Sequence, residues 1–296
     1  SQEALFAAMS QVFRSYDRAS AGQYRRDRGL PEASLAVMVQ QQVAGLCSGV
    51  AFSRDPFTCQ GAAVVIEANW GAASRVTAGQ EPPERYQVTV PDDLDEPLAR
   101  RGPDGWRIPP ALTLPVEGTG DIPSRLLQEV AFLARHLEQR DRGIPQNIEW
   151  SFDGDRLWLL QSRPIIPPAV RPAIPSGLLA GTAAHPPTPP VVLSGLPVCP
   201  GTAIGKIVVL KALTAPRPIT ATDIVVVPYL KAGEIPALAQ AGGLIAETGG
   251  QLSNGAIAAR EYGLPTIVLP HRGGRDRLTP AQTVRLQGTT GLVELW

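Results

Sequence analysis

Apolar residues recur with the period of an α-helix in two stretches of the first half of the chain. Residues 1–29 are expected to be helical because their apolar positions lie three or four residues apart. These positions are Leu5, Met9, Val12, Phe13 and Tyr16. Residues 123–140 show the same period, and Ser124 is the expected N-cap. The stripe expected to be buried there consists of Leu127, Val130, Leu133, Ala134 and Leu137.

Short runs of β-branched and aromatic residues predict strands between and after these helices. Residues 35–56 are expected to form strand, turn and strand, and residues 64–69 and 86–90 to add further strands. The tripeptide Asp-Gly-Asp at 153–155 separates the runs NIEWSF and RLWLLQ and therefore predicts a β-hairpin. Residues 91–110 are polar and rich in turn formers, which is typical of an exposed loop or insertion.

A proline-rich stretch interrupts this pattern. Ten prolines lie within the 34 residues from Pro164 to Pro197. Because proline fixes φ and lacks an amide hydrogen, such a stretch predicts an extended linker rather than a sheet or a long helix. Short apolar strands then alternate with short helical stretches, which predicts a compact α/β domain. We therefore expect domains at 1–166 and 194–296, joined by a linker at 167–193.

Composition narrows the functional classes. The 296 residues are 44% hydrophobic and carry 27 basic and 27 acidic side chains. A net charge of zero gives no field that would attract nucleic acid or an anionic membrane. Three scattered cysteines, Cys47, Cys59 and Cys199, predict neither a disulfide framework nor a zinc site. No apolar run is long enough for a membrane helix and no signal peptide is visible, so a cytoplasmic location is expected.

The predicted hairpin carries side chains suited to a metal and a phosphate. Glu149 and Gln161 offer a carboxylate and an amide oxygen, the hard ligands that Mg²⁺ prefers. Arg163 lies two residues further on and can clamp a phosphate. Leu159, Gln161 and Arg163 should share one face of their strand. Glu149 joins them only if the turn has an odd number of loop residues. On spacing alone, polar side chains on an edge hairpin of this kind are usually just solvated and bind no ligand.

The segment NIEWSFDGDRLWLLQSRPI resembles the end of the nucleotide-binding domain of the phosphoenolpyruvate-utilising enzymes, which include phosphoenolpyruvate synthase, pyruvate phosphate dikinase and rifampin phosphotransferase. The resemblance implies an ATP-grasp fold in which Glu149 and Gln161 bind Mg²⁺ and Arg163 contacts phosphate. VMVQQQVAGLCSGVAFSRDP resembles the family's strands beside adenine, which places Gln40 in a cofactor-binding position. NWGAASRVTAG resembles the family's Trp-Gly loop, with Ser74 where the family has glutamate. The likeness runs from about residue 3 to 166.

VCPGTAIGKIVVL and AETGGQLSNGAIAAREYGLPTIVLP resemble the swivelling β/β/α phosphohistidine domain of the same family. Asn254 stands where that family carries its phosphorylated histidine. Ser253 is expected to cap the following helix, whose N-terminal amides favour a phosphoryl group. Two alternatives stay open for Arg260: it pairs locally with Glu261, or it steadies a phosphate.

An asparagine cannot replace a carrier histidine. A neutral imidazole nitrogen is nucleophilic near pH 7, whereas the lone pair of an amide nitrogen is delocalised into its carbonyl. The three histidines of the chain, His136, His185 and His271, fall elsewhere. Asn254 is therefore a natural loss of the carrier, an engineered substitution, or a residue that forms hydrogen bonds instead of a covalent bond.

The family's first ATP-grasp half, with its lysine and glycine-containing loop, lies upstream of the matched region, and the chain has no lysine before Lys206. The chain alone is therefore expected to bind Mg-ATP weakly or not at all. We expect one subunit of a split ATP-dependent phosphotransferase, with a partner that supplies the missing half, or self-association. The alternatives are a non-catalytic accessory or regulatory pseudoenzyme, and a specialised-metabolism enzyme with a small-molecule substrate and a changed mechanism. Whether the chain is an enzyme stays open.

Overall fold

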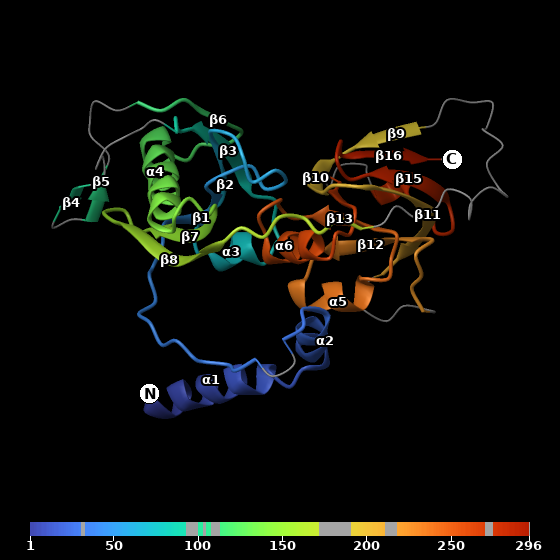
Figure 1. The fold of residues 1–296 in the computed structure, drawn as a ribbon, viewed down its shortest axis with the longest axis horizontal. Coiled ribbons are helices and arrows are strands. Elements are labelled where there is room, and N and C mark those ends of the chain that lie inside the picture. The colour runs from blue at the N-terminus through green and yellow to red at the C-terminus, as the bar shows by residue number, and fades with distance from the viewer. Residues whose placement is uncertain are drawn as a thin grey trace.

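The computed structural model describes residues 1–30, 33–92, 100–102, 105–107, 113–171, 191–210, 218–269 and 275–295. It has a mixed α/β architecture with two large sheets (Figure 1), which agrees with the α/β class expected from the sequence. Among the described residues, no helix combines the length and apolar character needed to cross a membrane.

The first sheet is antiparallel and has the strand order β6-β3-β2-β1-β7-β8. Its strands are β1 (Cys47–Phe52), β2 (Ala63–Trp70), β3 (Glu84–Thr89), β6 (Val116–Gly118), β7 (Gln146–Phe152) and β8 (Leu157–Pro164). A separate hairpin is formed by β4 (Arg100–Gly102) and β5 (Gly105–Arg107). The strands predicted at 64–69 and 86–90 and the hairpin around 153–155 are confirmed.

Helix α4 (Ser124–Arg140) covers one face of this sheet. The predicted stripe is confirmed: Leu127, Val130, Leu133 and Ala134 are buried, and Leu137 is partly buried against the same core. The predicted Ser124 cap is wrong. Pro123 occupies the N-cap position without a side-chain hydrogen bond, and Ser124 is already the first helical residue.

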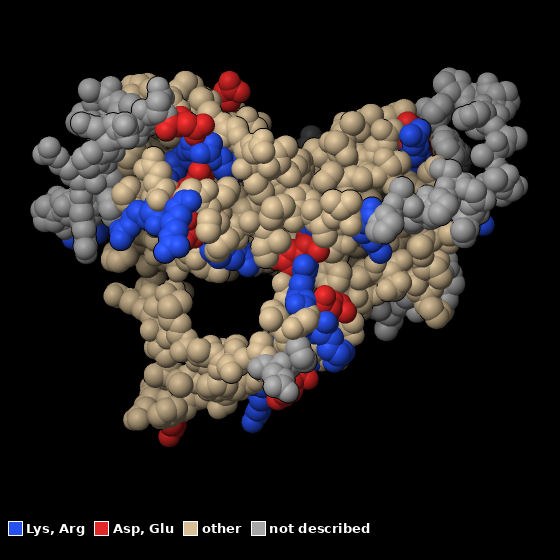
Figure 2. Space-filling model, viewed as in Figure 1, with Lys and Arg blue, Asp and Glu red and all other residues tan. Residues whose placement is uncertain are grey.

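The strand predicted before β1 does not form, since residues 33–46 have no regular secondary structure. Strand β1 pairs with β2 on one side and β7 on the other, so it has no free edge for a preceding strand. Met38 and Val39 are 75% and 60% exposed, so this segment buries little of its apolar surface. Figure 2 shows an opening between this end of the chain and the body of the molecule.

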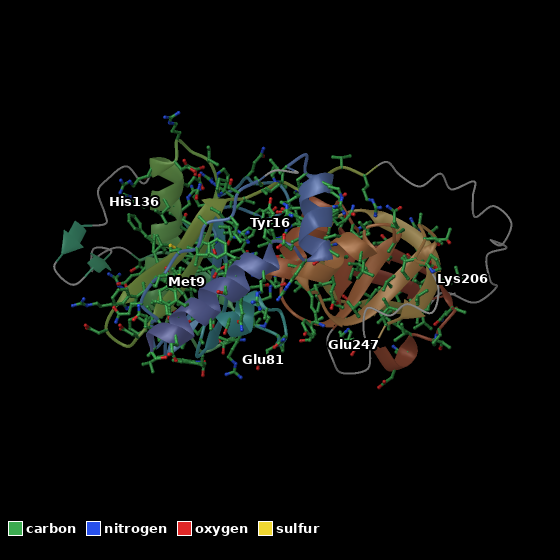
Figure 3. All side chains as sticks on the ribbon, turned by 90° about the horizontal axis from the view of Figure 1, so that it is seen from below. Met9, Tyr16, Glu81, His136, Lys206 and Glu247 are labelled. Carbon is green, nitrogen blue, oxygen red and sulfur yellow. The ribbon has the colours of Figure 1, made fainter. Side chains whose placement is uncertain are left out.

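The N-terminal helical prediction is confirmed, with a break at residues 16–18 between α1 (Gln2–Ser15) and α2 (Ala19–Asp27). Helix α1 buries none of its residues, and Leu5, Val12 and Phe13 stay exposed. Figure 3 shows Met9 and Tyr16 along this N-terminal segment, which crosses the surface of the molecule. Helix α2 contacts the second domain instead of the first sheet.

The second sheet has the order β10-β14-β13-β12-β11-β15-β16-β9, and β11, β12, β13 and β14 run parallel. Its strands are β9 (Val191–Ser194), β10 (Leu196–Cys199), β11 (Thr202–Val209), β12 (Asp223–Tyr229), β13 (Gly243–Thr248), β14 (Thr266–Val268), β15 (Thr283–Gln287) and β16 (Leu292–Leu295). The helical segments are η2 (Ala232–Glu234), α5 (Ile235–Leu238), α6 (Asn254–Glu261) and η3 (Arg275–Arg277). Strand β9 thus includes residues 191–193, which the sequence assigns to the linker.

The second domain docks on the face of the first sheet that α4 leaves open. Leu252 and Ile257, from α6 and the loop before it, join apolar residues of the first domain in one buried cluster. This docking cluster consists of Val50, Phe52, Val65, Val76, Ile165, Leu252 and Ile257. The docked face is the one that carries Glu149, because Val50 pairs with Glu149 across β1 and β7.

Candidate functional site at the docked face

Glu149 and Gln161 lie directly opposite each other on β7 and β8. Phe152 pairs with Leu157, which leaves a loop of four residues, an even number. An irregularity between Glu149 and Trp150 corrects the register, since Trp150 pairs with Leu159 but Glu149 pairs with Gln161. The extra residue, Leu160, also breaks the alternation from Leu159 to Gln161, so the expectation that both share one face is wrong.

The surroundings of Glu149 suit a hard cation. Burial raises the pKa of Glu149, and the nearby Arg163 guanidinium lowers it in part. Asn147 is in register with Arg163, and its side-chain oxygen is buried without a hydrogen-bond partner among the described residues. Oxygens from three side chains, the unpartnered Asn147, the desolvated Glu149 and the exposed Gln161 opposite it, therefore fit Mg²⁺. Sequence reasoning missed Asn147, although its place two residues before Glu149 on a strand was the available signal.

Gln40 lines a cavity of about 420 Å³ at the free edge of β8. The cavity lies between residues 40–44 and the strand end, and it includes the Trp158 indole and Leu160. Trp158 is held in place by a 2.7 Å hydrogen bond from its Nε1 to Asp153. The segment reaches the edge of the sheet without adopting the strand conformation that the sequence predicts.

Asn254 is the first residue of α6, and its Oδ1 accepts a 3.1 Å hydrogen bond from Arg163 Nη2. The predicted cap is confirmed, because Ser253 Oγ accepts the Ala256 amide at 3.3 Å. Gly249 takes φ +125° in the turn that leads into the helix. The contact joins the two domains, and it directs a guanidinium at the positive end of α6.

Arg163 and Asn254 share a cavity of about 570 Å³ with residues of α2 and the turn before it. Arg18 and Arg25 also line this cavity, together with Glu261, so the cavity beside the start of α6 holds three arginines and one carboxylate. Sequence reasoning missed Arg18 and Arg25, because their neighbours come from the second domain. Such a set, together with free helix amides, is suited to a phosphate or another anion.

Helix α2 is fixed to α6 by polar contacts. Tyr24 donates a 2.6 Å hydrogen bond to Glu261, and Arg28 lies 3.2 Å from the same carboxylate. Tyr262 also donates to Asp27 at 2.7 Å. In Figure 2, acidic and basic side chains gather over this contact.

Arg260 takes a different place from the other arginines. It is 1% exposed, and its Nη1 donates to the carbonyl oxygens of Val198 and Gln251 at 3.0 and 2.7 Å. Burial lowers the pKa of its guanidinium to about 10. Glu261 pairs with Arg28 rather than with Arg260. This geometry supports a structural role that fastens the 251 loop to β10, and it gives no support to phosphate contact.

The remaining sequence candidates lie outside this arrangement. Ser74 is exposed at the start of the short helix α3 (Ser74–Thr77). His136 is on α4, where burial lowers its pKa, and Figure 3 shows it in the first domain away from α6. His185 and His271 lie outside the described residues.

Comparison with known proteins identifies both domains. Residues 1–167 match the AMP/ATP-binding domain of pyruvate phosphate dikinase, and residues 219–291 match the mobile domain of the PEP-utilising enzymes. Phosphoenolpyruvate synthase from Pyrococcus furiosus is 28% identical over 288 residues, which cover 91% of this chain and 34% of the relative. The chain thus spans about a third of the length of such curated relatives.

Two other relatives match shorter stretches. Rifampicin phosphotransferase from Streptomyces sviceus is 36% identical over 36% of this chain and 12% of the relative. The prodigiosin synthesizing transferase PigC from Serratia marcescens is 31% identical over 49% of this chain and 17% of the relative. With both of its domains matched, and the first match covering more than half of its residues, this chain belongs to the PEP-utilising enzyme family.

Proposed function

We propose that this chain holds ATP and Mg²⁺ along β8, in an ATP-grasp type of site, and presents the phosphates to α6 of a swivelling β/β/α domain. The observation that carries the proposal is the course of β8. This strand lines the cavity near Gln40 with Leu160, carries Gln161 opposite Glu149, and brings Arg163 to Asn254. Three residues of strand span about 10 Å, which is the scale of the distance from a base to its phosphates.

Each group has a role in this arrangement. The backbone of residues 40–44 and the Trp158 indole hold the base, while Asn147, Glu149 and Gln161 hold the cation. Arg163, Arg18 and Arg25 neutralise phosphate charge together with the N-terminal amides of α6. Mg-ATP, when bound, supplies the phosphoryl group. The docking cluster excludes water from the neighbouring part of the sheet.

Asn254 cannot take up a phosphoryl group, because its amide nitrogen is not nucleophilic. We therefore propose that the chain works as one subunit of a split phosphotransferase. In this proposal a partner contributes the carrier and a lysine-bearing element over the phosphates, because phosphoryl transfer needs cationic groups that neutralise the phosphate charge.

One observation favours a second candidate, a non-catalytic accessory or regulatory protein. The Arg163–Asn254 hydrogen bond occupies a phosphate-binding guanidinium with a neutral amide from the docked domain. Such a contact stabilises the docked arrangement without any transfer chemistry.

Calorimetry tests the nucleotide site. The chain, alone and with any polypeptide that co-purifies from its native host, is titrated with ATP in the presence and absence of Mg²⁺. The chain alone should bind ATP weakly or not at all. With the partner present, binding should require Mg²⁺ and should be lost in Glu149→Gln and in Arg163→Met, whereas the exposed control Arg156→Met, on the same hairpin, should bind normally. If ATP binds equally well without Mg²⁺, or to both site variants, the proposed site is wrong.

Labelling separates the two candidates. Asn254→His, with Asn254→Gln as its matched control, is incubated with ATP labelled at the β and γ phosphates. A split phosphotransferase predicts acid-labile label on Asn254→His only when the co-purifying polypeptide is present. If ATP binds but no combination becomes labelled, the accessory role is supported and the transferase is rejected.

A further inference from the structure

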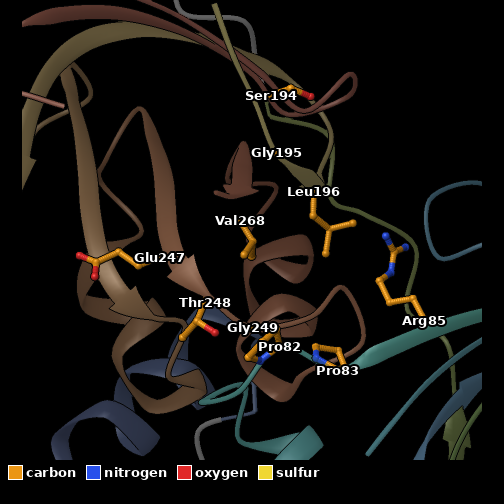
Figure 4. A pocket seen from close by; sticks show the side chains of 10 residues that line it. All are labelled: Pro82, Pro83, Arg85, Ser194, Gly195, Leu196, Glu247, Thr248, Gly249 and Val268. Carbon is orange, nitrogen blue, oxygen red and sulfur yellow. The ribbon is translucent and has the colours of Figure 1, made fainter. Parts of the chain in front are cut away.

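A second cavity lies along the seam between the two domains and is lined by residues other than those of the proposed nucleotide site. This seam cavity has a volume of about 360 Å³, within the range of small-molecule sites. The first domain contributes Pro82, Pro83 and Arg85, and the second domain contributes its other walls (Figure 4). The cavity therefore exists only while the domains are docked.

Its place in the second domain is one where α/β sheets commonly bind ligands. Glu247, Thr248 and Gly249 follow one another at the carboxyl end of β13, and Val268 is the last residue of its parallel neighbour β14. Ligands of open α/β sheets bind in crevices outside the carboxyl ends of parallel strands. The location alone thus favours a binding site.

The walls are mainly apolar. The rings of Pro82 and Pro83 lie on one side, and Leu196 and Val268 lie across from them in Figure 4. An apolar surface of this kind gains from covering by an apolar body of a few carbon atoms. A strongly hydrated inorganic ion would leave these walls without partners.

Thr248 and Arg85 are the polar groups that face the cavity. Thr248 is 8% exposed, its Oγ1 is buried without a hydrogen-bond partner among the described residues, and Figure 4 shows the hydroxyl directed toward the Gly249 and Pro82 side of the cavity. Glu247 turns its carboxylate the other way. A buried hydroxyl without a partner is costly, so an acceptor at this position would be stabilising.

Arg85 supplies the charge. Its Nε lies 3.2 Å from Glu67 Oε1, and its Nη2 donates to Gln251 at 2.9 Å. Nη1 makes no hydrogen bond to any described residue. Arg260 also acts on the fully buried Glu67 through its charge, so Glu67 is shared by two guanidiniums and Nη1 of Arg85 is left for a ligand.

We propose that the seam cavity binds a small organic carboxylate, which Arg85 and Thr248 hold by its oxygens while Pro82, Pro83, Leu196 and Val268 cover its apolar body. Because both domains form the walls, the bound carboxylate stabilises the docked arrangement. The chain is thus a receptor for a small carboxylate that controls domain docking, independently of nucleotide chemistry.

The test uses benzoate and 3-methylbutyrate as probes, with benzamide and 3-methylbutyramide as neutral matches. Binding is measured by NMR titration of the full chain. Domain docking is measured by hydrogen exchange of the Gln251 and Leu252 amides, which donate to Glu67 across the seam at 2.7 and 2.8 Å. A carboxylate present at ten times its Kd should raise their protection about tenfold.

Variants locate the site. Thr248→Val keeps the side-chain shape and should weaken carboxylate binding about tenfold. Leu196→Trp fills the cavity and should abolish binding, whereas Val192→Trp, at an exposed position of β9, should leave it unchanged. The proposal is overturned if neither carboxylate binds saturably, or if benzamide and 3-methylbutyramide bind as tightly as the carboxylates. It is also overturned if Leu196→Trp binds normally, or if bound carboxylate leaves the protection of the Gln251 and Leu252 backbone amides unchanged.

Discussion

Leu252 connects packing at the seam to domain docking in a way that one substitution can measure. The side chain is 1% exposed and belongs to the second domain, but it packs in the docking cluster with Val50, Phe52 and Val65 of the first. In an undocked second domain it would face water. Truncation in Leu252→Ala therefore acts on docking rather than on the folding of either domain. Buried leucine truncations cost about 2–5 kcal/mol, and a loss of about 2.8 kcal/mol corresponds to a hundredfold shift.

Hydrogen exchange reports this shift at defined amides. The Gln251 and Leu252 amides donate their hydrogens to Glu67 of the other domain, so their exchange should follow undocking. In Leu252→Ala their protection should fall about a hundredfold, while the amides of Ile66 and Val226 inside the two cores should keep theirs. Leu244→Ala, in the core of the second domain, is the matched control and should lower the protection of Val226 as well. Equal losses at all of these amides in Leu252→Ala, or no loss at Gln251 and Leu252, would refute this reasoning.

Three further results are expected. Burial raises the pKa of Cys47 and Cys199 to about 12, so iodoacetamide at pH 8 should modify only the half-buried Cys59 of the native chain, and mass spectrometry that finds Cys199 alkylated at the same rate would contradict this. Mg²⁺ competes with the proton on Glu149, whose pKa lies above the usual value of about 4.3; Mg²⁺ affinity measured by calorimetry should therefore fall as pH drops through that raised pKa, and a flat profile down to the usual value would exclude Glu149 as a ligand. Gly255→Ala would place a Cβ against the Leu230 carbonyl and should lower the free energy of unfolding by about 1–3 kcal/mol in a urea titration, whereas Ala258→Gly should cost about 1–2 kcal/mol through helix propensity and the loss of a buried methyl group.

Local signals were sufficient for much of the fold and for part of the site. The turn residues at 153–155 predict the β7–β8 hairpin, and Ser253 before an alanine-rich run predicts the start of α6. These features depend on neighbours within a few residues, so the sequence contains them directly.

Other features depend on distant partners, and the sequence missed them. Residues 35–43 begin with an apolar run that is typical of a strand, but both edges of β1 are already occupied by strands from elsewhere in the chain. The extra residue at Leu160 corrects the facing of Glu149 and Gln161, and no turn rule predicts it. Arg18 and Arg25 enter the cavity at Asn254 only because Tyr24 meets Glu261, 237 residues away.

That last contact changes how the second domain can move. Helix α2 precedes the first sheet in the chain but is fastened to α6, so it would move together with the second domain. The second domain is then attached to the first by two connecting segments, residues 33–46 before β1 and residues 165–168 after β8, because Ala169 and Arg171 already form hydrogen bonds to the second domain. A fully extended chain of that first length spans roughly 45 Å. Any movement of the second domain away from the first must extend both connecting segments together. The shorter segment therefore limits how far the second domain can move.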